Sequence, residues 1–282
     1  CVGPQMMPNS LKVAVAHPEV YILNGSLNAP HPYIRTYYGR MYEAKFLAGM
    51  IAGAVTDNER VAYIADYPIY GMIANINAFA LGVASVNPRA KVYLAWSKTK
   101  DYDRNKFLTE NDLHYVSDQD IITPNDASRY FGLYKLQDGQ ALNLAMPIWN
   151  WGVFYEKLLQ SVLAGSYKAE GQEQVKALNY WWGMSAGVID LICSKHVPYG
   201  VKRLADHLKS DITKGEVVPF FGQIYDQKGE LKNKGEHEMK PSDIMKMDWL
   251  VDNVVGSIPP MSEFVDNAKM VVELKGVEEN KL

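Results

Sequence analysis

The sequence predicts an α/β protein built around a parallel sheet. Three features of residues 35–96 support this class: an apolar helical face, two short β-rich runs and a helix between those runs. Apolar residues recur every three or four positions from Ala44 to Ala54, which is the period of a helix that lies on a sheet. The runs VAYIAD and KVYLAW are apolar enough for buried parallel strands. A strand, a crossover helix and a parallel strand form a right-handed unit, so this stretch organises the fold.

Composition and charge exclude several classes of protein. The 282 residues are 48% hydrophobic and 22% charged, which is ordinary for a globular chain with one large or two modest domains. The formal net charge is −3 and the basic residues are scattered, so the chain lacks the clustered Lys and Arg of a nucleic-acid surface. Its apolar runs are too short or too interrupted to span a bilayer.

No motif for catalysis, a metal or a cofactor emerges from the sequence. The six histidines lie far apart, and neither glycine signature of a phosphate-binding loop occurs. Cys193 lies in an apolar run, where a buried inert thiol is expected, and Ser185 falls short of the nucleophile-elbow pattern. We therefore expect no metal, no cofactor and no enzymatic activity. An enzyme that acts on nucleosides is the least favoured function.

The chain before the central stretch resembles the middle of an α/β layer. Pro8-Asn9-Ser10 caps a short helix, and the strand VYILNG follows after Pro18. A turn-rich link then leads into IRTYY. A sheet that begins in this way lacks its first strands. Its unpaired edge predicts either a companion segment or self-association.

After Trp96 the sequence predicts further strands and helices. Small residues within the first helix, Ala48, Gly49 and Gly53 among them, are expected to let it pack closely on the sheet. The expected later elements are a helix at Arg104–Asn111, strand LHYVS, a helix from Thr123-Pro124, strands FGLYKL and LNLAMPI, a helix at Trp151–Leu163 closed by Gly165, a helix at Tyr199–Lys214, a hairpin around Asp226–Gly229, a helix at Pro241–Val255 and a loosely docked, charged tail.

Aromatic and polar residues follow the predicted strands, where open parallel sheets bind ligands. Tyr67 and Tyr70 follow the first strand of the central stretch, and Trp96 ends the second. Asp118 and Asp120 end the third, and Lys135 lies at the end of the fourth. If all these strands are parallel, the residues meet at one edge. Aromatic faces stack on flat rings while the polar groups bind ring edges, although each residue considered singly is as well explained by packing or helix capping.

Longer stretches of the chain resemble a known family. YYGRMYEAKFLAGMIAGA, RVAYIADYPIYGMIANINAFALGVASVNPRAKVYLAWS, MPIWNWGVFYEKLLQSVLAGSY and PFFGQIYDQKGE are similar to the basic membrane protein family of substrate-binding proteins. The likeness spans roughly residues 5–258 and includes the purine-nucleoside-binding lipoproteins of ABC importers. It implies a type I periplasmic-binding-protein fold, in which two α/β lobes close on a purine nucleoside or a free purine base.

The resemblance also implies how the lobes divide along the chain. Residues 1–36 and 147–180 are expected to form a partial N-terminal lobe, incomplete at its N-terminus. Residues 37–146 and 181–225 are expected to form the C-terminal lobe, followed at 226–282 by the end of the hairpin, a helix and the tail. Family members carry about two βα units before the position of Cys1, so a missing N-terminal segment is expected.

The same resemblance assigns candidate ligand contacts. The family's acidic contact in the first lobe falls at Asn24, its second-lobe aromatic falls near Trp96, and its ribose-binding lysine falls near Trp149. Because this chain has other residue types at the acidic and lysine positions, a free purine or another flat ligand is as compatible with the sequence as a nucleoside. The rings expected to stack or wall the pocket are Trp96, Trp149, Tyr67 and Tyr70. The side chains expected to form hydrogen bonds are Asn24, Ser26, Asn150 and Asp120.

The family's role implies a location and a partner. An exported protein of this kind is an extracytoplasmic, membrane-anchored lipoprotein, and its partner is an ABC transporter permease. A leading Cys is also the acylated residue of such lipoproteins, although the residues after Cys1 read as the interior of a βα loop. The chain shows no signal peptide, so a cytoplasmic ligand-sensing regulatory module with the same fold is the alternative.

Overall fold

The computed structural model describes residues 6–25, 34–120, 129–165 and 180–277. The chain divides into two compact units. The first unit comprises residues 1–40 and 149–190, and the second comprises residues 41–148 and 191–282. Both units combine helices with strands, and both contain parallel strand pairs, which confirms the predicted α/β class. Within the described ranges, none of the helices combines the length and the apolar character needed to cross a bilayer.

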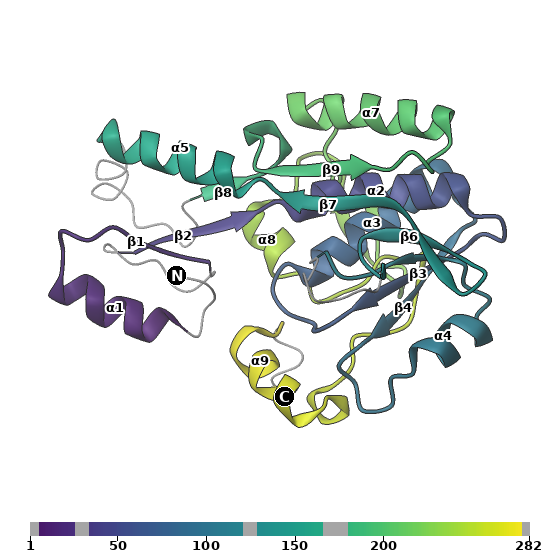
Figure 1. Cartoon of the computed structure of the whole chain (residues 1–282). Coiled ribbons are helices and arrows are strands. Elements are labelled where there is room, and N and C mark those ends of the chain that lie inside the picture. The colour runs from purple at the N-terminus through teal and green to yellow at the C-terminus, as the bar shows by residue number, and fades with distance from the viewer. Residues whose placement is uncertain (1–5, 26–33, 121–128, 166–179, 278–282) are drawn as a thin grey trace. The chain divides into compact units, whose positions relative to one another are not determined.

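The first unit contains a three-stranded sheet between two helices. Its strand order is β1-β2-β8, and both pairs are parallel. Ile34 of β2 packs with the first helix, α1. The ring centroid of Tyr37 lies 4.9 Å from that of Phe154 in α5. Because the two β2 residues are an odd number of positions apart, they point to opposite faces, and α1 and α5 cover one face each (Figure 1). The bounds are α1 (Met7–Ala16), β1 (Ile22–Asn24), β2 (Ile34–Gly39), α5 (Trp151–Leu163) and β8 (Tyr180–Trp182).

In the described part of this sheet, β1 is an edge strand. The expected companion segment or self-association at this edge stays a prediction.

The second unit is built on a seven-stranded sheet. Its order is β12-β4-β3-β5-β6-β7-β9. The strands from β12 to β5 are parallel, but β6 is antiparallel to both β5 and β7. The bounds are β3 (Arg60–Ala65), β4 (Lys91–Trp96), β5 (Tyr115–Ser117), β6 (Leu133–Gln137), β7 (Gln140–Trp149), β9 (Ile189–Cys193) and β12 (Val254–Val255).

The direction of β6 corrects one sequence expectation. Lys135 pairs with Tyr115, at the start of β5, so it does not lie at the carboxyl edge of the sheet. Its ammonium lies 5.1 Å from the centroid of the Tyr115 ring and 3.9 Å from Asp57. The strand itself was predictable from its apolar run, but its direction depends on pairing with neighbours that the run does not encode.

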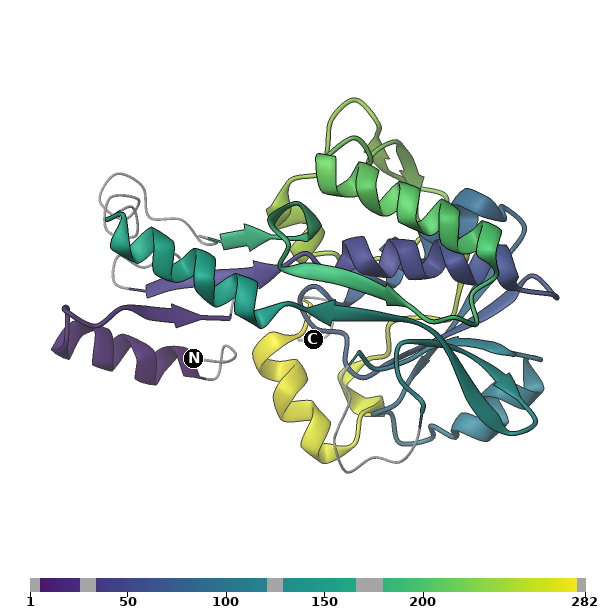
Figure 2. The ribbon, with the colours of Figure 1, turned by 45° about the horizontal axis from the view of Figure 1, so that its top comes forward.

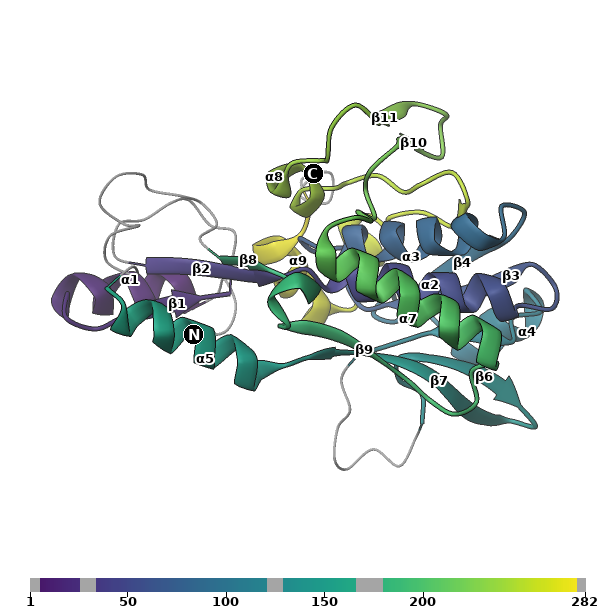
Figure 3. The same ribbon diagram turned by 90° about the horizontal axis from the view of Figure 1, so that it is seen from above.

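Helices α2 (Met41–Val55) and α3 (Met72–Val86) are in close backbone contact. A methyl group on Gly49 would overlap the carbonyl oxygen of Phe79, and one on Gly82 would overlap that of Phe46. The small residues of α2 therefore permit a helix-to-helix contact, which corrects the expectation that they serve packing on the sheet. Helix α7 (Tyr199–Lys214) lies beside α2 (Figures 2 and 3).

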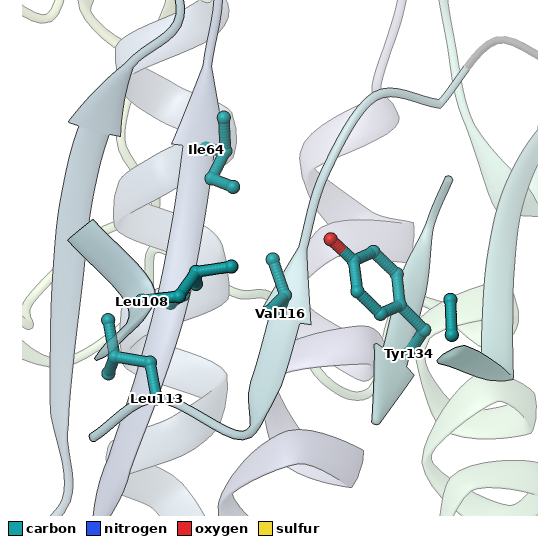
Figure 4. Packing of buried hydrophobic residues seen from close by; sticks show 7 residues of the cluster. Ile64, Leu108, Leu113, Val116 and Tyr134 are labelled. Carbon is teal, nitrogen blue, oxygen red and sulfur yellow. The ribbon is translucent and has the colours of Figure 1, made fainter. Parts of the chain in front are cut away.

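A cluster of apolar side chains fixes helix α4 (Arg104–Glu110) to the sheet. Leu108 of α4 packs with Leu113, with Ile64 of β3 and with Val116 of β5 (Figure 4). Tyr134 of β6 belongs to the same cluster and is fully buried. This packing holds the start of α4 close to the end of β5.

The C-terminal region differs from the sequence prediction in two ways. Helix α8 (Pro241–Met245) ends ten residues before the predicted boundary at Val255. Asn77 of α3 explains the early end, because its amide donates to the Trp249 carbonyl at 2.8 Å and accepts from the Val251 N–H at 3.0 Å. Helix α9 (Asp266–Lys275) is also firmly docked, since Ala268 and Val272 are fully buried.

Candidate functional site

The carboxyl ends of β3, β4 and β5 carry polar side chains at one edge of the second unit. Ala65 of β3 pairs with Trp96 of β4, so Asp66 and Ser97 follow at the same level. The Ser97 hydroxyl donates a hydrogen bond to Asp66 Oδ1. Strand β5 pairs with the other side of β3 and ends just before Asp118. The three strand ends predicted to lie together are therefore neighbours.

Asp118 is a buried carboxylate whose two oxygens are both engaged. Arg104 Nη1 and the Tyr134 hydroxyl bind Oδ2 at 2.8 and 3.1 Å, and the Gln119 N–H donates to Oδ1 at 2.8 Å. Its side chain is only 4% exposed, so these donors replace the hydrogen bonds to water that the carboxylate loses on burial. Burial and the nearby Asp118 charge raise the pKa of Tyr134, which keeps its hydroxyl a donor. Asp118 thus joins α4, β5 and β6.

Asp120, two residues later, keeps one oxygen available. Lys45 of α2 lies 2.7 Å from Oδ1, and the Asp120 side chain is 21% exposed. In the part of the chain that the structure describes, Oδ2 accepts no hydrogen bond. Burial raises the pKa of Asp120 above its usual range, while the charge and the hydrogen bond of Lys45 oppose that rise. Asp120 therefore offers a hydrogen-bond acceptor at the strand ends.

The predicted aromatic contacts of the second unit lie around the same strand ends. Trp96 is buried, and its indole N–H donates to the Ser257 carbonyl at 2.8 Å. Tyr67 is partly buried against a cluster that contains Phe264 and Val272. Tyr70 is partly exposed and follows Tyr67 in the same loop. Tyr67 and Tyr70 come from the loop after β3, whereas Trp96 is the last residue of β4.

Two predicted contacts of the first unit lie at the start of α5. The Trp149 ring stacks on Trp151, with centroids 4.5 Å apart and an interplanar angle of 6°. It also covers Gly39, where any Cβ would overlap the indole ring. The Asn150 side-chain amide donates to the Gly187 carbonyl at 3.0 Å. The Asn150 backbone N–H donates to the Val188 carbonyl at 2.8 Å. Both residues are thus held in fixed orientations.

Asn24 is an unpaired polar group inside the first unit. Its side chain is 0% exposed, yet neither Oδ1 nor Nδ2 has a hydrogen-bond partner among the described residues. Leaving a buried amide unpaired costs about 1–3 kcal/mol, so a group that bonded to it would recover that free energy. The other predicted contact of this region, Ser26, lies outside the described residues.

Sequence reasoning missed Lys45 and Arg104. Lys45 lies within a mostly apolar helix that also contains Glu43, and Arg104 begins a short helix beyond a polar loop. The available signal for Lys45 was the position itself, because a lysine on a helix that is buried almost throughout needs an acidic partner. Among the described residues, no three His, Cys, Asp or Glu side chains gather into a group that could hold a metal ion.

Solved structures with a similar fold identify the fold of this chain. An ABC transporter solute-binding protein from Conexibacter woesei superposes with a TM-score of 0.52, 16% identity and 77% coverage of each chain. A transcriptional activator of the comK gene from Bacillus halodurans gives a TM-score of 0.57 with 14% identity, over 77% of this chain and 78% of that one. Such low identities establish the fold alone, which is that of the periplasmic binding proteins.

Sequence comparisons then give the family. Residues 3–130 match the model of the Bmp family, described as ABC transporter substrate-binding protein PnrA-like. A purine-binding protein from Brucella abortus is 26% identical over 266 residues, which cover 90% of this chain and 74% of that protein. A Haloferax volcanii protein that bears the name of an ABC transporter glucose-binding protein is 33% identical over 165 residues, which cover 54% of this chain and 40% of that protein. The resemblance found in the sequence is confirmed, since residues 3–130 match the family model of the PnrA-like ABC transporter substrate-binding proteins.

Proposed function

We propose that the protein binds a purine nucleoside or a free purine base in the cleft between its two lobes. The observation that carries this proposal is the match to the Brucella purine-binding protein, which extends over 90% of this chain. In this role the chain acts as a binding protein and not as an enzyme. Its partner is the permease of an ABC-type uptake system, to which the occupied protein delivers its ligand.

The chemistry of the strand ends supports a flat, polar ligand. A purine presents ring faces for stacking and a hydrogen-bonding edge with both donors and acceptors. Asp120 offers an acceptor, and Asn24 offers an acceptor and a donor that are unpaired. Tyr67, Tyr70 and the stacked Trp149 supply aromatic surface. Together, stacking and edge contacts account for micromolar binding, roughly −8 kcal/mol.

The proposed location follows from the same role. An uptake protein of this family is exported, and we infer that it is anchored outside the membrane as a lipoprotein. The gene sequence upstream of Cys1 tests this directly. A signal peptide with a lipobox supports the anchored form. An upstream soluble domain without an export signal contradicts it and supports a cytoplasmic ligand sensor with the same fold.

Thermal unfolding with a panel of ligands tests the proposed ligand class. Adenosine, guanosine, inosine and their free bases are each added to the protein. At least one of them should raise the Tm, because a ligand that binds only the folded state stabilises it by mass action. The Asp120→Asn variant should show a smaller rise. Asp206→Asn is the matched control, since Asp206 is an exposed carboxylate that pairs with Lys202 on α7.

The panel also contains glucose, because one relative bears the name of a glucose-binding protein. If none of the six purine compounds changes the Tm of the wild-type protein, the proposed ligand class is wrong. A rise with glucose alone replaces the purine with a sugar.

A further inference from the structure

Lys45 is a buried lysine whose ammonium group faces the end of β5. Its side chain is 1% exposed. Three oxygens lie near Nζ: Asp120 Oδ1 at 2.7 Å, Ser117 Oγ at 3.3 Å and the Asp118 carbonyl at 3.5 Å. All three belong to the last residue of β5 or to the loop that follows. The lysine of α2 thus reaches the same strand end that carries Asp120.

Packing alone does not explain this lysine. Burying an ammonium group costs free energy, and an apolar side chain of similar volume is often at least as stabilising at such a position. The neighbours of Lys45 in α2 are buried residues, so an apolar side chain would suit the helix. The cost is offset by the oxygens at the end of β5 and by the face of the Tyr63 ring, whose centroid lies 5.1 Å from Nζ. The shortest of these contacts is the one to Asp120.

The charges around Asp120 show what Lys45 changes. The groups that face this carboxylate are Lys45 from α2 and Asp118 from the loop after β5. Asp118 is itself paired with Arg104 of α4 and bonded to Tyr134 of β6. Burial and the Asp118 charge both raise the pKa of Asp120, and Lys45 lowers it. Without Lys45, every remaining influence favours the protonated, neutral form.

We propose that Lys45 is a positioning residue for ligand recognition, because it holds Asp120 Oδ1 and directs Oδ2 toward the ligand as a charged acceptor. This inference rests on the proposed function. It specifies that the ligand presents an N–H or O–H donor to Asp120, as the ring N–H of guanosine and inosine or the amino group of adenosine does. A ligand that presents only acceptors to this carboxylate is excluded.

Binding measured against pH tests the proposal. Inosine, guanosine and adenosine are titrated calorimetrically into the wild type, Lys45→Met, Asp120→Asn and the double variant over about three pH units around neutrality. Lys45→Met should weaken binding about tenfold near neutral pH, the loss expected for a charge-assisted hydrogen bond. Its affinity should recover as the pH rises, because Asp120 then ionises without help. The affinity of Asp120→Asn should not recover.

The double variant separates positioning from a general structural effect. If Lys45 acts through Asp120, adding Lys45→Met to Asp120→Asn should not weaken binding further. Additive losses, or a pH profile for Lys45→Met that parallels the wild type, overturn the proposal. Lys202→Met is the matched control, because it removes an exposed lysine that is also paired with an aspartate at 2.7 Å. It should bind as the wild type does.

A ligand-free measurement keeps the two proposals distinguishable. The side-chain carboxyl carbon of Asp120 is followed by NMR through a pH titration of the wild type and of Lys45→Met, with near-ultraviolet circular dichroism to check folding. The pKa of Asp120 should be higher in the variant. An unchanged pKa overturns the role of Lys45 whatever the ligand is, whereas wild-type protein that binds no purine compound refutes the proposed function.

Discussion

Asp118 and Asp120 lie two residues apart, yet their surroundings give them different roles. Asp118 receives three donors and is almost completely buried, so it braces the loop after β5. Asp120 is bound by Lys45 through one oxygen, and its side chain is partly exposed. The sequence pattern does not distinguish these two carboxylates, because their burial and their hydrogen-bond partners depend on residues of α2, α4 and β6. Side-chain partners distant in the chain therefore decide which acid is free to contact a ligand.

The raised pKa of Asp120 predicts how stability depends on pH. A carboxyl group whose pKa is higher in the folded than in the unfolded state takes up protons on folding. Its favourable contribution is complete below the unfolded-state pKa and is lost as the pH rises through the folded-state pKa. Asp120→Asn removes this titration. Its free energy of unfolding relative to the wild type should therefore increase as the pH rises above about 4, the pKa of an aspartate in the unfolded chain.

Urea unfolding of both proteins at several pH values measures this difference. A constant offset between the two proteins does not affect the slope. A difference that falls as the pH rises contradicts the proposed environment of Asp120. Asp206→Asn is the control for a general effect of removing a carboxylate, because Asp206 is exposed.

At the scale of elements, close contact between α2 and α3 predicts an unusual response to alanine. Gly49→Ala would place a methyl group against the backbone of Phe79, so the helices must separate. We expect a loss of about 1–3 kcal/mol in the free energy of unfolding, the cost typical of overpacking. Alanine is otherwise the better helix former by about 1 kcal/mol.

Gly200→Ala is the matched control in the same unit. Gly200 lies in α7, and a Cβ there would have no neighbour within 4 Å. This variant should be as stable as the wild type or slightly more so. Equal stability of the Gly49 and Gly200 variants in chemical unfolding would contradict the described helix contact.

Elements with a strong local signal were predictable from the sequence. The helices at Trp151–Leu163 and Tyr199–Lys214 have the predicted bounds, since both combine an apolar stripe with a glycine beyond the end. The boundary at Met245 was missed because Asn77 binds the backbone of residues 249–251 from another helix. The direction of β6 was missed for a similar reason. Long-range partners set both features, and local periodicity does not report them.

For the whole molecule, we propose that the protein binds a purine compound in contact with Asp120. The strand ends, the aromatic loops and Asn24 were candidates from the sequence. The pairing of Lys45 with Asp120 and the burial of the Asn24 amide required the structure. The match of residues 3–130 to the family model supports the class of binding protein.

The most direct measurement is a crystal structure of the protein grown with inosine. Our account predicts density for the purine with a donor of the ligand within hydrogen-bond distance of Asp120 Oδ2 and Lys45 still bound to Oδ1. Density for inosine elsewhere, or a bound purine with Asp120 Oδ2 facing only solvent, would contradict the account.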